Sequence, residues 1–541
     1  MNHSGQRSPV FLLSSRAFEA PRAAPGDAGE QVQRPPARAS AAERSPAWRA
    51  GAPALNRSLR TGMAAYGALA ALLGWLLWRA MDPGGLTTDS FFQLEQAQGR
   101  RPYNDWHPVI MSWNWARLLD LTGAVGSMAA VQVLLATGGS ALLVYYLLVS
   151  TRSIPLGALG LAPLVLPNTA GMWGIVWKDV QMALALLLCV VLTMLIRARP
   201  RAAWPLAALA AGFLIYGVLV RKNAAVVAIP LLMLGCLQLL RTRGAVLSAR
   251  RYALTVAASF AALCALVAAG SAAMSAATHP ERTSQVSQVM LDDIVFAVPA
   301  EAVVASSAPD WMKDKILAAK ELCARKGRIW DAYWSCYGKG AQGESFTAIR
   351  DPAALQALWA QEIPAHLPEY AAYRFRTTGE FLSTSTLITV DPQQATEYGL
   401  GPTAPEARAG LDGYVLWAAT WLPFLFRGWF ALVVCAAGLA VAALRRTRSV
   451  SAALICASGI TYLLTFVPAA PAANYRYVFW SMLAGLLGWI VLLGERRARA
   501  LRGAPPTVIG KDGAGGQPVW FALRRTGRAI GKRSAQSDSP S

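Results

Sequence analysis

The chain has 541 residues, of which 55% are hydrophobic and 15% are charged, and its formal net charge is +21 at pH 7. A soluble protein would carry about 25% charged residues, whereas the apolar residues here form blocks of roughly 17–25, long enough to cross a ~30 Å hydrocarbon layer as helices. This pattern excludes a soluble enzyme, a nucleic-acid-binding factor and a secreted disulfide-rich domain. It predicts an all-α polytopic membrane protein.

Hydropathy predicts about ten transmembrane helices. Seven of them fall within residues 62–277 and three within residues 413–494, and a long polar insertion over residues 278–412 separates the two groups. The expected spans cover residues 62–79, 126–149, 153–172, 180–196, 203–220, 224–240, 252–276, 414–443, 450–468 and 478–494.

The distribution of charge predicts the orientation of these spans. Residues 1–61 and 495–541 are basic, whereas the insertion holds 17 Asp and Glu against 12 Lys and Arg. Because basic loops stay in the cytoplasm, we expect two unstructured cytoplasmic tails and an outside insertion, in a bacterial inner membrane. The positive charge then reflects topology and attraction to anionic membrane lipid, and no nucleic-acid partner is expected.

The first outside loop, residues 81–125, combines ionisable and aromatic side chains. Asp89 lies in a Thr-Thr-Asp-Ser sequence just beyond the first span, and Asp105 and His107 follow it. A carboxylate in such a loop suits acid–base chemistry. The same sequence around Asp89 also fits a helix N-cap, and His107 before Pro108 also fits a simple turn.

Cations and a second carboxylate occur in the short outside turns between later spans. Ionisable residues at membrane depth are costly and usually functional. The turns hold Lys178 and Asp179, then Arg221 and Lys222, and finally Tyr475 and Arg476. All of them are expected at the membrane face that carries Asp89. Cations there would hold a lipid phosphate by charge-assisted hydrogen bonds, or they would bind anionic lipid headgroups.

The insertion is expected to be a helix-rich extracytoplasmic domain, because apolar residues recur at helical spacing over residues 309–326 and 351–381. Cys323 and Cys336 lie in it, on the oxidising side of the membrane, so we predict a disulfide between them. A disulfide that closes so short a loop adds ~3 kcal/mol on the chain-entropy model. A metal site is the alternative, but no nearby His or second Cys pair supports it.

Four short motifs occur in order on the expected outer face. They are an Asp in the first outside loop, a HisPro dipeptide before the second span, a LysAsp pair in the second outside loop and an ArgTyr pair near the last span. Through the order of these motifs, the chain resembles the C-type, polyprenyl-phosphate-dependent membrane glycosyltransferases, in particular their family 39-like bacterial members. The resemblance covers most of residues 62–494. Relatives include protein O-mannosyltransferases and the aminoarabinose transferases of lipid A.

The resemblance implies transfer of a sugar from a polyprenyl-phosphate donor to a cell-envelope glycan, lipid or protein outside the cytoplasmic membrane. It implies that Asp89 is the catalytic carboxylate and that Asp179 is the second acid. It also implies that Arg476 neutralises the phosphate of the donor. No nucleotide is expected, and some of these enzymes use a divalent metal. Many relatives carry an Asp-Glu pair in the first loop, whereas Ser90 follows Asp89 here, so the metal is unassigned.

The expected mechanism is a direct displacement that inverts the anomeric centre, with Asp89 as the base on the acceptor hydroxyl and cations stabilising the leaving phosphate. We assign Lys178, Arg221, Lys222 and Arg476 to the donor phosphate, and Asp105, His107 and Tyr475 to acceptor or loop positioning. The alternatives are a transporter or flippase of lipid-linked sugars and an O-antigen-ligase-like transferase. A transporter predicts charged or broken helices near mid-membrane, and the spans are almost free of charge at their centres.

Overall fold

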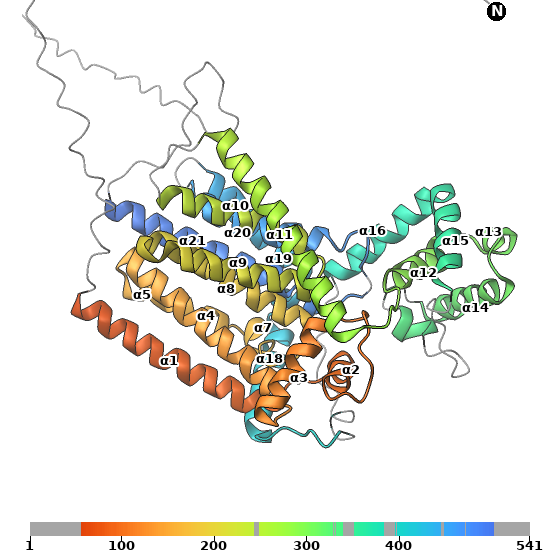
Figure 1. Ribbon diagram of the computed structural model, residues 1–541, viewed down its shortest axis with the longest axis horizontal. Helices are drawn as coiled ribbons and strands as arrows, with labels where there is room; N and C mark the ends of the chain where they lie inside the picture. The colour runs from red at the N-terminus through yellow and green to blue at the C-terminus, as the bar shows by residue number, and fades with distance from the viewer. Residues whose placement is uncertain are drawn as a thin grey trace, which may run out of the picture. The chain divides into compact units, whose positions relative to one another are not determined.

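The computed structural model describes residues 56–242, 248–327, 329–330, 332–338, 351–383, 395, 398–444, 448–470 and 472–502 (Figure 1). The chain divides into two units, Met1–Pro53 and Ala54–Ser541, and every described residue belongs to the second unit. The expected tails therefore lie mostly outside the described residues. Where the structure does describe them they are helical, since the first helix begins at Arg57 and the last one continues to Arg502.

The described residues form helices and no named strand, with two isolated β-bridges, Gly85–Ile175 and Asn104–Glu281. Seven helices are long and apolar enough to cross a membrane, which is consistent with a polytopic membrane protein. These helices are α1 (Arg57–Met81), α4 (Ser127–Thr151), α8 (Lys178–Ala198), α9 (Ala203–Val220), α10 (Ala224–Thr242), α11 (Ala249–Thr278) and α21 (Phe479–Arg502).

The other three expected spans are not single long helices. Residues 153–172 break into short pieces, because each proline among them lacks the backbone N–H that a continuous helix needs. Residues 414–443 divide at Pro423 for the same reason, and the helix within 450–468 has only 15 residues. The pieces are α5 (Ile154–Ala158), η1 (Leu159–Leu161), α6 (Ala162–Val165), α7 (Pro167–Ala170), α18 (Pro405–Trp421), η5 (Pro423–Phe426), α19 (Gly428–Ala443) and α20 (Val450–Leu464).

Helix α8 is the most enclosed element of the bundle. Every residue from Asp179 to Ile196 is buried, as expected for a helix that is hydrophobic on all sides. Helices α4, α9, α10 and α21 pack against it, and Figure 1 shows them running alongside it. The charged pair Lys178-Asp179 therefore begins a helix that is otherwise surrounded by protein.

The described residues between 286 and 383 form a helix-rich domain with an apolar core of its own, which includes Leu291, Ile316 and Leu355. One helix reproduces the prediction over 309–326, whereas the pattern over 351–381 is two helices that meet at His366. The elements are α12 (Val286–Ala297), α13 (Ala300–Ala305), α14 (Asp310–Lys326), η3 (Tyr333–Tyr337), α15 (Pro352–Ala365) and α16 (Leu367–Ser383).

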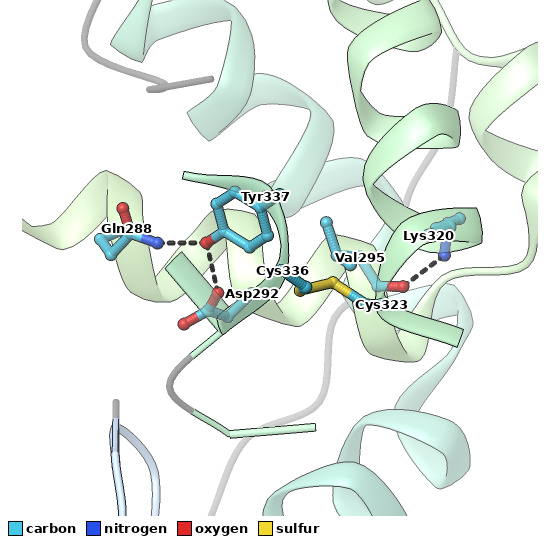
Figure 2. The surroundings of a disulfide bond; sticks show 7 residues. All are labelled: Gln288, Asp292, Val295, Lys320, Cys323, Cys336 and Tyr337. Atoms are coloured by element: carbon cyan, nitrogen blue, oxygen red, sulfur yellow. Dashed lines mark hydrogen bonds between the residues drawn. A yellow bond between two sulfur atoms is a disulfide. The ribbon is translucent and has the colours of Figure 1, made fainter. Parts of the chain in front are cut away.

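Cys323 on α14 and Cys336 in η3 are joined by the expected disulfide (Figure 2). Tyr337, next to the bridge, donates a 2.5 Å hydrogen bond to Asp292 on α12. Lys320, one turn before the bridge, donates to carbonyls in the last turn of α12 at 2.7 and 3.0 Å. The disulfide therefore fastens together two segments that both bind α12.

Replacing both bridged cysteines, Cys323→Ser with Cys336→Ser, is expected to lower the free energy of unfolding of this domain by ~3 kcal/mol. The readout is amide hydrogen exchange across residues 286–383 in the full chain. The control is Cys264→Ser, which removes an exposed free thiol and is expected to leave exchange unchanged. Unaltered protection in the double variant would show that the helix packing alone holds the domain.

The domain is also expected to lose stability as the pH rises from about 4 to about 7. Burial raises the pKa of Asp292 to about 7, against smaller opposing effects of Tyr337 and Arg374, and burial raises that of Asp293 to about 6. The folded domain thus keeps protons that the unfolded chain releases near pH 4, so protonation favours the fold in acid.

Thermal unfolding between pH 4.5 and 7.5 measures this dependence. Asp292→Asn is expected to flatten it, whereas Asp314→Asn, which alters an exposed carboxylate on α14, is expected to leave the slope as it is. Equal slopes in the wild type and Asp292→Asn would contradict the assignment.

Candidate functional site

A group of charged side chains gathers where the first turn of α8 meets three loops. Helix α2 (Thr88–Ala97) brings Asp89 in its first turn. Helix α3 (Val109–Thr122) follows the loop that brings His107, and η6 (Tyr475–Tyr477) brings Arg476. The backbone N–H of Thr87 donates to Ser90 Oγ at 3.1 Å, so the reciprocal bonding at the start of α2 uses Ser90 and leaves Asp89 for other partners.

Helix α2 is fastened to the segment that enters α8. Ser90 Oγ donates to the carbonyl of Val176 at 2.9 Å, and Trp177 Nε1 donates to Thr87 Oγ1 at 2.8 Å. The N–H of Val176 also donates to the carbonyl of Gly85 at 3.0 Å. These bonds fix the position of Asp89 relative to Lys178 at the start of α8.

Asp89 forms the centre of the group. Its Oδ2 accepts a 2.5 Å hydrogen bond from Arg476 Nη1, and its Oδ1 lies 3.8 Å from His107 Nε2. Burial by itself raises the pKa of Asp89. Arg476, His107 and Lys178 together lower it by more than burial raises it, so the pKa lies well below the usual range. Asp89 is therefore ionised, and its side chain keeps 23% exposure.

His107 bridges Asp89 and Lys178. Its Nδ1 lies 3.0 Å from Lys178 Nζ. Burial, followed by the charge of Lys178, lowers the pKa of His107 to about 3, so the imidazole is neutral near pH 7. An ammonium has only donors, so Nδ1 accepts from Lys178 and the proton resides on Nε2, which faces Asp89.

A second ion pair lies beside the first. Arg221, at the end of α9, places Nη1 3.1 and 3.3 Å from the two carboxylate oxygens of Asp179. The side chain of Asp179 has 0% exposure. Asp179, the expected second acid, is thus an enclosed carboxylate that is paired with Arg221.

Tyr477 links the two ion pairs. The guanidinium carbons of Arg476 and Arg221 lie 4.9 and 5.1 Å from the centroid of its ring, within the range of a cation–π interaction. The Tyr477 hydroxyl also accepts from Arg476 Nη2 at 2.9 Å. On the Arg476 side, the ring of Trp177 lies 5.3 Å away. The two arginines are thus held side by side by aromatic rings.

Three predicted site residues have other surroundings. Lys222 is exposed. Asp105 Oδ1 accepts from the N–H and hydroxyl of Thr283 at 2.7 and 2.6 Å, which ties the first loop to the segment between α11 and α12. Tyr475 is buried and its hydroxyl donates to the carbonyl of Asn168 at 3.0 Å. These contacts hold Asp105 against the segment before α12 and Tyr475 inside the bundle.

Sequence reasoning missed the supports of the site. Gln132 on α4 donates to the carbonyls of Trp173 and Ile175 at 3.1 and 2.9 Å, and so holds the segment that leads to Lys178. A glutamine within an apolar span was the available signal, since a buried amide needs partners. The aromatic residues Trp177 and Tyr477 stood directly beside the charged residues in the sequence.

The donor set does not fit a divalent metal. Such an ion prefers several carboxylate or carbonyl oxygens, whereas Asp89 is the one partly exposed carboxylate of the described cluster and is bound by Arg476. Lys178 adds a second cation nearby. Across the described ranges, no group of three His, Cys, Asp or Glu side chains has a metal-binding arrangement. The described cluster therefore lacks the set of oxygen ligands that a divalent metal prefers.

Breaking the buried pair from the arginine side is expected to destabilise the fold. Arg221→Met leaves the Asp179 carboxylate enclosed without its counter-charge, a change that costs ~3–5 kcal/mol. Lys222→Met removes the neighbouring exposed cation and is expected to change little. The midpoint of thermal unfolding in detergent compares the two variants. Equal midpoints for both would show that Asp179 does not depend on Arg221.

Comparison of the chain with protein-family models, curated proteins and solved structures gave no match.

Proposed function

We propose that the protein is a membrane glycosyltransferase that moves a sugar from a polyprenyl-phosphate carrier to a cell-envelope acceptor. One observation carries the proposal: Asp89, a partly exposed carboxylate, shares one site with Arg476 and Lys178 at the ends of apolar helices. A phosphate-linked lipid needs cations for its head and apolar surface for its tail. A transfer reaction also needs a base beside them.

The charge of the site favours an anionic ligand. Three cations, Lys178, Arg221 and Arg476, stand against two carboxylates, Asp89 and Asp179, and His107 is neutral, which leaves a net charge of +1. The Nε atoms of Arg221 and Arg476 are buried and have no hydrogen-bond partner among the described residues. Guanidinium groups with donors to spare bind phosphate oxygens by charge-assisted hydrogen bonds.

Donor binding also prepares the base. A carboxylate with a very low pKa is a weak proton acceptor, and Arg476 is the strongest contact that keeps the pKa of Asp89 low. When the phosphate of the sugar donor accepts hydrogen bonds from Arg476, the interaction of Arg476 with Asp89 weakens and the pKa of Asp89 rises. The site thus gains basicity when the donor is present.

The reaction that fits these residues is a single displacement. The acceptor oxygen forms a bond to the anomeric carbon while its proton passes to Asp89, and the bond from that carbon to the phosphate oxygen breaks. The electron pair leaves with the phosphate, whose added charge Arg476 and Lys178 stabilise. Asp179 acts through Arg221 as a positioning residue. Direct displacement inverts the anomeric centre.

The proposed setting is a bacterial inner membrane, with the Asp89 site outside and both chain termini in the cytoplasm. In this topology the three shorter apolar segments, Ile154–Val165, Gly428–Ala443 and Val450–Leu464, complete ten crossings. The domain of residues 286–383 lies outside, and its disulfide supports that placement.

Transport of a lipid-linked sugar is the competing function. It would need charged or broken structure near the middle of the membrane. Helix α8 is continuous and carries no Asp, Glu, Lys, Arg or His between Val180 and Ile196, which favours chemistry at the surface over passage through the bundle. An O-antigen-ligase-like transferase is the other alternative, and the assay below offers both a monophosphate and a diphosphate donor.

Asp89→Asn is expected to lower the transfer rate by about 10²–10⁴-fold, the usual contribution of a general base. The assay reconstitutes the purified protein with radiolabelled polyprenyl-monophosphate and polyprenyl-diphosphate sugars and an envelope extract. Asp120→Asn is the matched control, because Asp120 pairs with Arg117 at 3.0 Å in the same loop region but is 60% exposed. Full activity in Asp89→Asn would remove the centre of the proposal, and label that crosses sealed vesicles without covalent transfer would establish transport.

A further inference from the structure

A second group of cations lies at the opposite end of α8. The 21 residues of this helix span about 30 Å, so its last turn is one hydrocarbon thickness away from Lys178. Arg197 stands in that last turn and Arg241 in the last turn of α10. Arg448 precedes α20 and Arg499 lies on α21.

Side-chain contacts bring these helix ends together. Gln238 on α10 donates to Ser451 Oγ at 3.1 Å. Ser449 and Ser451 donate to the two oxygens of Glu495 on α21 at 2.8 and 2.7 Å. One turn further along α21, Arg499 Nη1 lies 3.5 Å from the carbonyl of Arg448.

Arg241 belongs to the same group. Its guanidinium interacts electrostatically with Arg197, Arg499 and Glu495. The four arginines, Arg197, Arg241, Arg448 and Arg499, therefore form one cluster, which we call the distal arginine cluster.

The distal arginine cluster is short of negative charge. Among the described residues that contact one another here, four arginines against the carboxylate of Glu495 give a net charge of +3. The carboxyl ends of α8 and α10 each supply about −0.5 charge, which leaves about +2. Glu495 is itself engaged by two serine hydroxyls and by Arg499 at 3.6 Å, so its single charge does not balance the excess of these described residues.

Two of the guanidiniums also have unused donors. Arg241 Nε and Arg448 Nε are buried and have no hydrogen-bond partner within the described part of the chain. Buried donors in native proteins normally have partners, in the protein or in a bound molecule. Guanidinium donors suit phosphate because their fork matches two phosphate oxygens.

We propose that the distal arginine cluster is a binding site for the phosphate group of an anionic membrane lipid. Its position at the ends of membrane-length helices puts it at headgroup depth, where anionic lipid attracts basic side chains. The unmet donors and the local excess of charge distinguish it from an evenly spread basic surface. This site does not depend on the transfer reaction proposed for Asp89.

The test titrates the full-length protein, purified in a neutral detergent, with dioleoylphosphatidylglycerol, dioleoylphosphatidylcholine or inorganic phosphate. Retained lipid is counted by native mass spectrometry, and the unfolding midpoint is followed in parallel. Phosphatidylglycerol is expected to be retained and to raise the midpoint by several degrees. Phosphatidylcholine and inorganic phosphate are expected to give less than half of that shift.

The decisive variant is Arg241→Gln with Arg448→Gln, which is expected to lose most of the retained phosphatidylglycerol and of the shift. Its matched control is Arg250→Gln with Arg251→Gln, which removes two exposed charges at the start of α11 and is expected to behave as the wild type. Arg241→Lys with Arg448→Lys keeps the charge but removes the planar fork, and it is expected to retain less lipid than the wild type even if the glutamine variant does not fold.

Equal loss of lipid in the control would overturn the proposal, because binding would then follow net charge alone. Full retention in the lysine variant would overturn the role of the guanidinium fork. A midpoint shift from inorganic phosphate as large as that from phosphatidylglycerol would make free phosphate the ligand and overturn the lipid assignment.

Discussion

The structure depends on how two charges are accommodated at the start of a fully enclosed helix. Helix α8 is buried from Asp179 to Ile196, so neither Asp179 nor Lys178 reaches bulk water freely. An unpaired charge in such a place is strongly unfavourable. Asp179 is satisfied by Arg221, and Lys178 by the neutral ring of His107.

The rest of the site follows from these two contacts. Arg221 reaches Asp179 only because α9 ends there, and the ring of Tyr477 contacts both Arg221 and Arg476. His107 reaches Lys178 only because the first loop is fastened to the segment before α8, which brings Asp89 to Arg476. The contacts that accommodate the buried charges therefore also produce a cluster with an ionised carboxylate and with guanidinium donors that have no partner among the described residues.

The sequence predicted the parts of the fold that depend on composition along the chain. Seven of the ten expected spans are single membrane-length helices, and the helical spacing over 309–326 predicted α14 to within one residue. The breaks at residues 153–172 and at Pro423 were visible as prolines, but hydropathy windows average over them. The grouping of Asp89 with Arg476 followed from their expected face. The different surroundings of Arg221 and Lys222, one buried against Asp179 and the other exposed, could not be predicted. The two residues are adjacent at a helix end, and the sequence does not show which side chain turns toward the protein.

The pairings of the site also have an order in time. Asp179 and Arg221 are 42 residues apart, whereas Asp89 and Arg476 are 387 apart. The partner of Asp179 is therefore synthesised soon after it, whereas the partner of Asp89 is synthesised only after 387 further residues. A prematurely terminated product that lacks α21 and the turn before it would hold Asp89 next to His107 and Lys178 without its arginine. The ion pair at the centre of the site therefore requires the turn before α21, which carries Arg476.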